Sequence, residues 1–176
     1  MEFNDLIKIR RSTRKYTEER PDHDQIEEIL KKAQQAPSWK NLQSARSYVA
    51  ESPEILEKLR TEGLPEFNRK NSENAVLIVS TFVPGLSGFA GETQSNEQGN
   101  AWGAYDLGLH DAYLVLAASD AGFDTLIMGI RDADAIRKLL AIPENEEIFS
   151  VIALGKKAQE PQLRKRKELG EVAKFF

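Results

Sequence analysis

The segment Ala104–Ala121 restricts the fold more than any other part of the chain, because its apolar residues surround most of a helix. These residues are Tyr105, Leu107, Leu109, Ala112, Tyr113, Leu114, Val115, Leu116 and Ala117. A helix that is apolar on most sides must be buried, either inside its own domain or against a partner. Gly122 follows as the natural C-cap residue. The segment therefore predicts a long central helix that needs cover on more than one side.

Three β-branched apolar runs predict the strands around this helix. Ala75–Val83 is a nearly continuous apolar run, which is typical of a strand buried on both faces. Shorter runs at Thr125–Ile130 and Ile148–Leu154 predict two more strands, and Ser47–Ala50 predicts a fourth, short one.

Capping residues and apolar spacing predict four further helices. They are a short helix capped by Asn4, a helix over 24–35 behind the Asp22–Gln25 capping box, a helix from Pro53 to Gly63, and a helix from Asp132 that stops before Pro143. Helices and strands alternate irregularly and no linker is visible. We therefore expect one α+β domain over 1–176, with helices packed on a central mixed or antiparallel sheet.

Composition excludes several classes of protein. The chain has no Cys, so thiol catalysis, zinc-thiolate sites, iron–sulfur clusters and disulfides are ruled out. The net charge of −4 argues against nucleic acid as the main partner. There is no run of 18 apolar residues and no apolar core near Met1, so neither a membrane span nor a secretory signal is predicted. A cytoplasmic protein is the expectation.

Other familiar site patterns fail. Gly85, Gly88 and Gly91 follow a strand, but their spacing differs from the dinucleotide fingerprint, and Pro84–Gly103 is better interpreted as a mobile loop over a site. His110 and Asp111 are helix neighbours, whose side chains we expect to point about 100° apart. No metal site and no catalytic acid–base pair is predicted, so a cofactor is expected to do any chemistry.

Basic residues gather at the two ends of this acidic chain, in Lys8–Lys15 and again in Lys156–Lys167. Two such clusters suggest a local anion site. The first contains Arg10-Arg11-Ser12-Thr13-Arg14 at the end of the short first helix, where arginines can also simply meet the negative end of the helix dipole. The second contains Arg164-Lys165-Arg166, which can equally be a solvated basic run.

Further motifs stand between these two clusters in a specific order. After the helix over 24–35 comes Ala36-Pro37-Ser38-Trp39-Lys40-Asn41-Leu42-Gln43; Met128-Gly129 ends a strand, and Ala153-Leu154-Gly155-Lys156 follows. In this order the set closely resembles the FMN-dependent nitroreductase family over nearly the whole chain. The resemblance implies a nitroreductase-like fold and an intertwined homodimer.

The resemblance also implies roles for individual residues. Arg10, Ser12 and Arg14 would hold the phosphate and the pyrimidine edge of FMN, with Arg11 contributing backbone and Arg164 and Arg166 completing the phosphate clamp. Pro37, Ser38, Trp39 and Asn41 would reach the FMN of the opposite subunit. Met128 and Gly129 would lie against the flavin, and Asn68 matches a family flavin contact loosely. Met128 and Trp39 can alternatively be packing residues.

The implied activity is that of an oxidoreductase without a catalytic side chain. NADH or NADPH would reduce FMN, and a small oxidised acceptor such as a nitroaromatic or a quinone would then take the electrons in a ping-pong cycle. Two alternatives stay open: a flavin-dependent dehydrogenase of a specialised metabolite, and a flavin-binding homodimer without catalysis.

Overall fold

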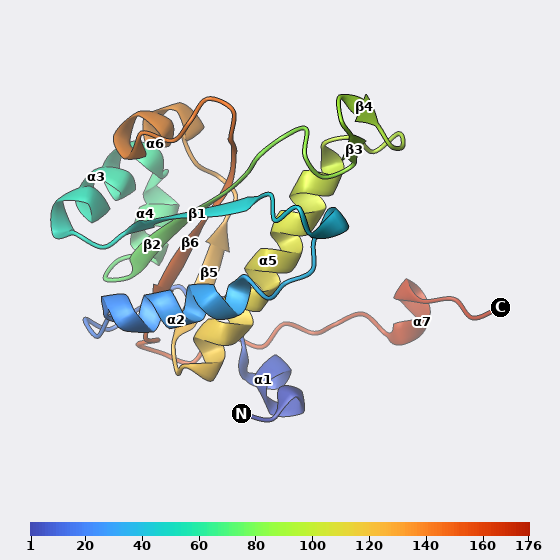
Figure 1. Ribbon diagram of the computed structural model, residues 1–176. Coiled ribbons are helices and arrows are strands. Elements are labelled where there is room, and N and C mark those ends of the chain that lie inside the picture. Colours follow the sequence, from blue (N-terminus) through green and yellow to red (C-terminus); the bar gives the residue numbers. More distant parts are fainter.

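The computed structural model describes all 176 residues, and its centre is a four-stranded antiparallel sheet in the order β1-β2-β6-β5 (Figure 1). The strands are β1 (Ala45–Ala50), β2 (Val76–Phe82), β5 (Asp124–Met128) and β6 (Glu147–Gly155). All three strand pairs are antiparallel, so the expected mixed or antiparallel sheet is the antiparallel one. Each of the four predicted strands is confirmed, and β1 begins two residues earlier than expected.

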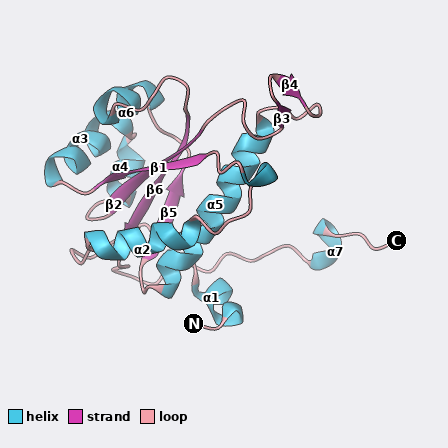
Figure 2. Ribbon diagram, viewed as in Figure 1, coloured by secondary structure: helices cyan, strands magenta, loops and turns pink.

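Helices cover both faces of this sheet and give three layers (Figure 2). One core cluster joins Leu56 and Leu59 of α3 (Pro53–Gly63) and Ile136 of α6 (Ala133–Leu140) to one sheet face. The other cluster joins α2 (His23–Ala33) and α5 (Ala101–Asp120) to the opposite face. Every residue of β2 is buried, because this central strand is covered on both faces and both sets of its alternating side chains enter a core.

The predicted helix starts are confirmed for α2, α3 and α6 because side-chain caps are formed. Asp22 and Gln25 make the reciprocal capping box of α2. Ser52 accepts from the backbone N–H of Ile55 in α3, and Asp132 accepts from that of Ala135 in α6. The cap predicted at Asn4 is wrong: the N-cap of α1 (Phe3–Ile9) is Glu2, two residues earlier, and the backbone carbonyl of Glu2 accepts from the N–H groups of Asp5 and Leu6.

The central helix α5 packs Leu107, Leu114 and Ala118 fully into the protein. Gly122 follows it in the left-handed region at φ +83°, as the predicted stop requires. The opposite side of the helix is uncovered in a single chain, with Tyr105 60% and Tyr113 42% exposed. One chain therefore covers only part of the apolar surface that the sequence shows.

Four small features were not predicted from the sequence. They are the 3-10 helix Trp39–Asn41, α4 (Glu66–Asn71), α7 (Leu169–Val172) and the hairpin of β3 (Phe89–Ala90) with β4 (Thr93–Gln94). The hairpin lies within the segment 84–103 that was predicted as a mobile loop, and local hydrogen bonds link the two sides of this segment, since Gly85 N–H donates to Asn100 Oδ1 and Trp102 Nε1 to Asn96 Oδ1. After β6 the chain stays paired with residues 15–17 up to Ala158, whose N–H donates to the carbonyl of Lys15, and α7 lies away from the other elements (Figure 1). None of the helices combines the length and the hydropathy that a bilayer crossing requires.

Candidate functional site

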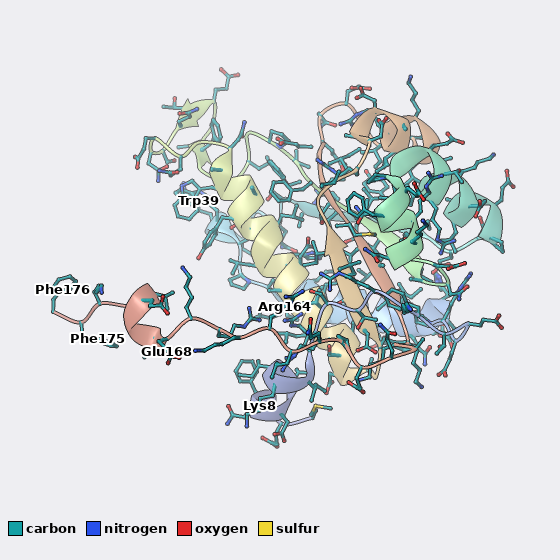
Figure 3. All side chains as sticks on the ribbon, turned by 180° about the vertical axis from the view of Figure 1, so that it is seen from behind. Lys8, Trp39, Arg164, Glu168, Phe175 and Phe176 are labelled. Carbon is teal, nitrogen blue, oxygen red and sulfur yellow. The ribbon has the colours of Figure 1, made fainter.

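The two ends of the chain meet in a cleft of about 710 Å³ that contains six cationic residues and no carboxylate. Its lining residues are Ile7, Lys8, Arg10, Arg11, Ser12, Arg14, Gln159, Pro161, Gln162, Leu163, Arg164 and Arg166. We call this the cationic cleft. In Figure 3 Arg164 lies where the tail leaves the body, and Lys8 lies below it on α1. The two predicted basic clusters thus belong to one site.

Backbone hydrogen bonds hold the first wall of the cleft on the edge of the sheet. Ser12 forms a parallel bridge with Thr125 of β5, and the N–H of Thr13 donates to the carbonyl of Thr125 at 3.0 Å. The hydroxyl of buried Tyr16 donates to the carbonyl of Thr13 at 2.9 Å. These contacts place the residues on both sides of Thr13 at a defined position beside β5.

The cations of the cleft have no protein counter-charge. None of Lys8, Arg10, Arg11, Arg14, Arg164 and Arg166 lies within ion-pair distance of a carboxylate. Burial, followed by the nearby charges of Arg166 and Arg11, lowers the pKa of Arg10. Like charges gathered at a partly desolvated place repel each other, so the cleft is suited to a multiply charged anion.

The outer edge of β5 continues from the cleft as an apolar surface. Ile127 is 51% exposed on the sheet face opposite Met128, and Gly129 follows with open space where a side chain would stand. Met128 itself is 2% exposed, and its side chain packs in the core. From Thr125, beside Ser12, to Gly129 the edge extends about 13 Å at the usual rise of a strand. A flat group that begins at the cleft can therefore lie along Ile127 and Gly129.

The predicted contact Asn68 takes a supporting position. It is buried in α4, and its Nδ2 donates to the carbonyl of Ile130 at 2.8 Å. This bond fixes the chain just after Gly129. Asn68 does not line the cationic cleft.

The loop Pro37–Gln43 lies elsewhere, toward the N-terminal end of α5, as the positions of Trp39 and Arg164 in Figure 3 show. Three of its residues without glycine's freedom adopt positive φ: Lys40 at 46°, Asn41 at 57° and Gln43 at 49°. Such backbone costs free energy and persists only where surrounding contacts hold it. Ser38 Oγ contributes by accepting from the N–H of Gln43 at 3.0 Å.

Asp106 of α5 holds this loop and was missed by the sequence analysis. Its carboxylate is 4% exposed and accepts from the N–H of Trp39 at 2.9 Å and from Ser87 Oγ at 2.6 Å. The ring of Trp39 packs against Trp102 with centroids 4.8 Å apart. The sequence did contain a signal for Asp106, because it is an isolated carboxylate within a mostly apolar helix. Asp106 therefore joins the loop, the helix and the segment before the hairpin.

The structure thus separates the predicted site residues into groups. Arg10, Arg11, Ser12, Arg14, Arg164 and Arg166 line one cleft, to which Lys8 is added. Gly129 directly follows the edge strand β5. The side chain of Met128 is buried in the core, so only its backbone is available to a ligand at that edge. Pro37, Ser38, Trp39 and Asn41 do not reach the cleft of their own chain.

One expectation about the histidines is wrong. His110 Nδ1 lies 3.2 Å from Asp111 Oδ1, although the two residues are neighbours on α5. The angular separation of helix neighbours describes their Cβ atoms, and the longer imidazole reaches back across it. Ser80 Oγ donates to the same carboxylate oxygen at 3.0 Å, so Asp111 bridges α5 and β2 in a buried polar contact.

The layered antiparallel fold defines an α+β protein whose cationic cleft is suited to an anion, and comparisons with known proteins narrow the class. The chain belongs to the nitroreductase family, whose model matches residues 7–156. It is 31% identical over 159 residues to an Archaeoglobus fulgidus protein named "Putative NADH dehydrogenase/NAD(P)H nitroreductase", covering 85% of this chain and 82% of that one.

Two solved structures show the same fold. A nitroreductase family protein of Streptococcus pneumoniae superposes with a TM-score of 0.85 at 21% identity, covering 99% of this chain and 100% of that chain. An oxidoreductase containing FMN superposes with a TM-score of 0.80 at 25% identity, covering 98% of this chain and 91% of the other.

Proposed function

We propose that the protein is an FMN-dependent NAD(P)H oxidoreductase that works as a homodimer and reduces small oxidised organic molecules such as nitroaromatics and quinones. The cationic cleft is the observation that carries this proposal. A relative is named for NAD(P)H nitroreductase activity and a structural neighbour for its FMN, and both names support the same assignment.

The residues of the cleft fit the phosphate of FMN. Arg10, Arg14 and Arg166 offer planar guanidinium forks, which bind phosphate through paired charge-assisted hydrogen bonds. The phosphate brings nearly two negative charges to a place that holds none, so its binding relieves the repulsion around Arg10. Ser12 and Arg11 contribute the polar wall between the guanidinium groups.

The strand edge beyond the cleft would receive the flavin ring. Gly129 and the backbone of Met128 let a flat ring approach the chain, and Ile127 gives it an apolar surface. When bound, FMN supplies the two-electron chemistry between NAD(P)H and the acceptor. The chain positions it, and a cation such as Arg14 at the pyrimidine edge favours its reduced, more negative state. We assign no catalytic side chain. NAD(P)H and the acceptor would use the same exposed ring face in turn, which gives a ping-pong cycle.

A second copy of the chain would complete the site. The uncovered face of α5 carries Ala101, Tyr105, Gly108, Ala112 and Tyr113, spaced along one side of the helix. The extended tail exposes further apolar side chains, including Phe175 at 85%. In a two-fold dimer both surfaces would be buried on the partner, giving the intertwined arrangement. The loop with Pro37, Ser38, Trp39 and Asn41 would then reach the partner's FMN.

The experiment is a reductase assay on the purified protein. We expect a yellow homodimer that releases free FMN on heat denaturation and consumes NADH or NADPH rapidly once a quinone is added. A protein that stays colourless and does not bind added FMN would contradict the proposal. A flavin-containing dimer without acceptor-dependent NAD(P)H consumption would instead indicate a binding protein, and a sedimenting monomer with FMN bound would contradict the shared site.

A further inference from the structure

A second cavity lies between α3, α4 and the turn that precedes β2, and its volume is about 520 Å³. It is lined by Arg20, Pro53, Leu56, Glu57, Arg60, Thr61, Arg69, Lys70, Glu73 and Asn74. No residue is shared with the cationic cleft. Only one of the ten lining residues is hydrophobic, so the cavity suits a polar ligand.

Two arginines are fixed in this cavity by backbone carbonyls of one turn. Arg60 donates from Nε to the carbonyl of Ser72 at 3.3 Å and from Nη2 to that of Ala75. Arg20 donates from Nε to the carbonyl of Asn74 at 2.7 Å. Nη1 of Arg60 and both Nη groups of Arg20 make no hydrogen bond within the protein. Donors that are held in place and left free are prepared for an acceptor.

The charge of these arginines is not neutralised by contact. Neither Arg20, Arg60 nor Arg69 lies within ion-pair distance of a carboxylate, and Lys70 is paired with Glu66 at 2.6 Å. Burial, followed by the neighbouring charge of Arg20, lowers the pKa of the half-buried Arg60, although the charges of Glu57 and Glu73 act in the opposite direction. Two guanidinium groups are therefore held close to each other although they repel. Partly buried arginines are normally paired with an anion, and here Glu57 and Glu73 act on the charge of Arg60 without coming within ion-pair distance of it.

We propose that this cavity binds a small phosphate monoester that carries hydroxyl groups. Arg20 and Arg60 would take the phosphate through their free N–H groups. Glu57 of α3 and Glu73 after α4 also line the cavity, where their carboxylates would accept hydrogen bonds from hydroxyls and disfavour ligands with a second anionic group. Asn74 donates from Nδ2 to Tyr16, which leaves its Oδ1 as a further acceptor. The site goes beyond the proposed reductase function and does not depend on it.

The test is calorimetric titration of glycerol 3-phosphate into the purified protein at low salt. We expect saturable binding at one site per chain, and weaker binding of inorganic phosphate, which lacks the hydroxyls. Arg20→Ala should weaken glycerol 3-phosphate by about tenfold or more, because charge-assisted hydrogen bonds are lost. Arg60→Lys, which keeps the charge and loses the fork, should do the same without removing a cation from the turn.

Two control variants locate the binding. Lys58→Ala removes one positive charge from α3 outside the cavity, where Lys58 pairs with Glu54, and should leave the affinity unchanged. Arg166→Ala alters the cationic cleft and, with FMN in saturating excess so that this cleft stays occupied, should also have no effect. Absence of saturable binding, loss of binding in Arg166→Ala, or equal affinity for glycerol 3-phosphate and inorganic phosphate would overturn the proposal.

Discussion

Both walls of the cationic cleft present arginine side chains, but the backbone of one wall is anchored to the sheet and the backbone of the other is not. The N-terminal wall is tied to β5 through Thr13, which is 1% exposed, and its Arg10 is partly desolvated. The C-terminal wall, with Arg164 and Arg166, lies on an exposed tail without regular structure up to α7. A flexible segment that becomes ordered on binding loses conformational entropy, and this loss lowers the affinity. The anchored wall is thus positioned without a ligand, whereas in the proposed dimer the tail would gain its position from FMN and from the partner chain.

Arg10→Ala should have the largest effect, because Arg10 is the desolvated member of the anchored wall. Removing one member of a desolvated charge pair costs about 2–5 kcal/mol. At about 1.4 kcal/mol per tenfold, FMN should bind at least tenfold more weakly. Fluorescence titration of FMN into the apoprotein measures this. If Arg10→Ala weakened FMN less than Arg166→Ala does, the N-terminal wall would not be the stronger part of the phosphate site.

Asp106→Asn tests the loop that we assign to the partner's site. Losing the charge weakens two hydrogen bonds, those from Trp39 and Ser87, and should lower the free energy of unfolding by about 1.5–3 kcal/mol. FMN affinity should fall as well, because the strained loop loses its anchor. Glu92→Gln changes an exposed carboxylate and is the matched control. Denaturant unfolding with unchanged stability would show that Asp106 does not hold the loop.

Tyr16→Phe sharpens the description of the anchored wall, with a smaller effect. Loss of the hydrogen bond to Thr13 should lower the free energy of unfolding by about 1 kcal/mol at neutral pH.

The same variant should change the alkaline limit of stability. Burial, and secondarily Asp124, raises the pKa of the Tyr16 hydroxyl above its ordinary value of 10.0. The folded state then keeps a proton that the unfolded chain releases above about pH 10, so stability is complete below that pH and is lost as the pH rises. Thermal unfolding from pH 8 to 11 should show a smaller alkaline loss in Tyr16→Phe. Parallel curves for the two proteins would contradict this assignment.

Local signals in the sequence predicted most of the fold. The Asp22–Gln25 box, the caps at Ser52 and Asp132 and the buried run of β2 depend on neighbouring residues or on a strong period, and all are confirmed. The six-residue α4 and four-residue α7 are too short to show a helical period, so they were missed. The antiparallel order of the sheet depends on long-range pairing, which periodicity does not contain.

The candidate site shows a similar division. Six of the twelve residues that line the cleft were predicted from motifs at both chain ends, namely Arg10, Arg11, Ser12, Arg14, Arg164 and Arg166. Asp106 and Ile127 were not, because their importance follows from tertiary placement. The motif correctly indicated the end of β5, but it did not indicate which side chain faces outward. The alternation of side chains along the strand buries Met128 and exposes Ile127.

The most direct test of the central claim is FMN titration into the apo forms of Arg166→Ala and Lys167→Ala. Both residues are exposed cations on the tail, and Arg166 alone lines the cleft. We predict that Arg166→Ala weakens FMN by about tenfold, a smaller loss than in Arg10→Ala because the tail is exposed, and that Lys167→Ala is nearly silent. Stability without FMN should hardly change in either variant, since exposed cations contribute little alone. Equal FMN affinities in the two variants would remove the tail from the phosphate site and contradict the two-walled cleft.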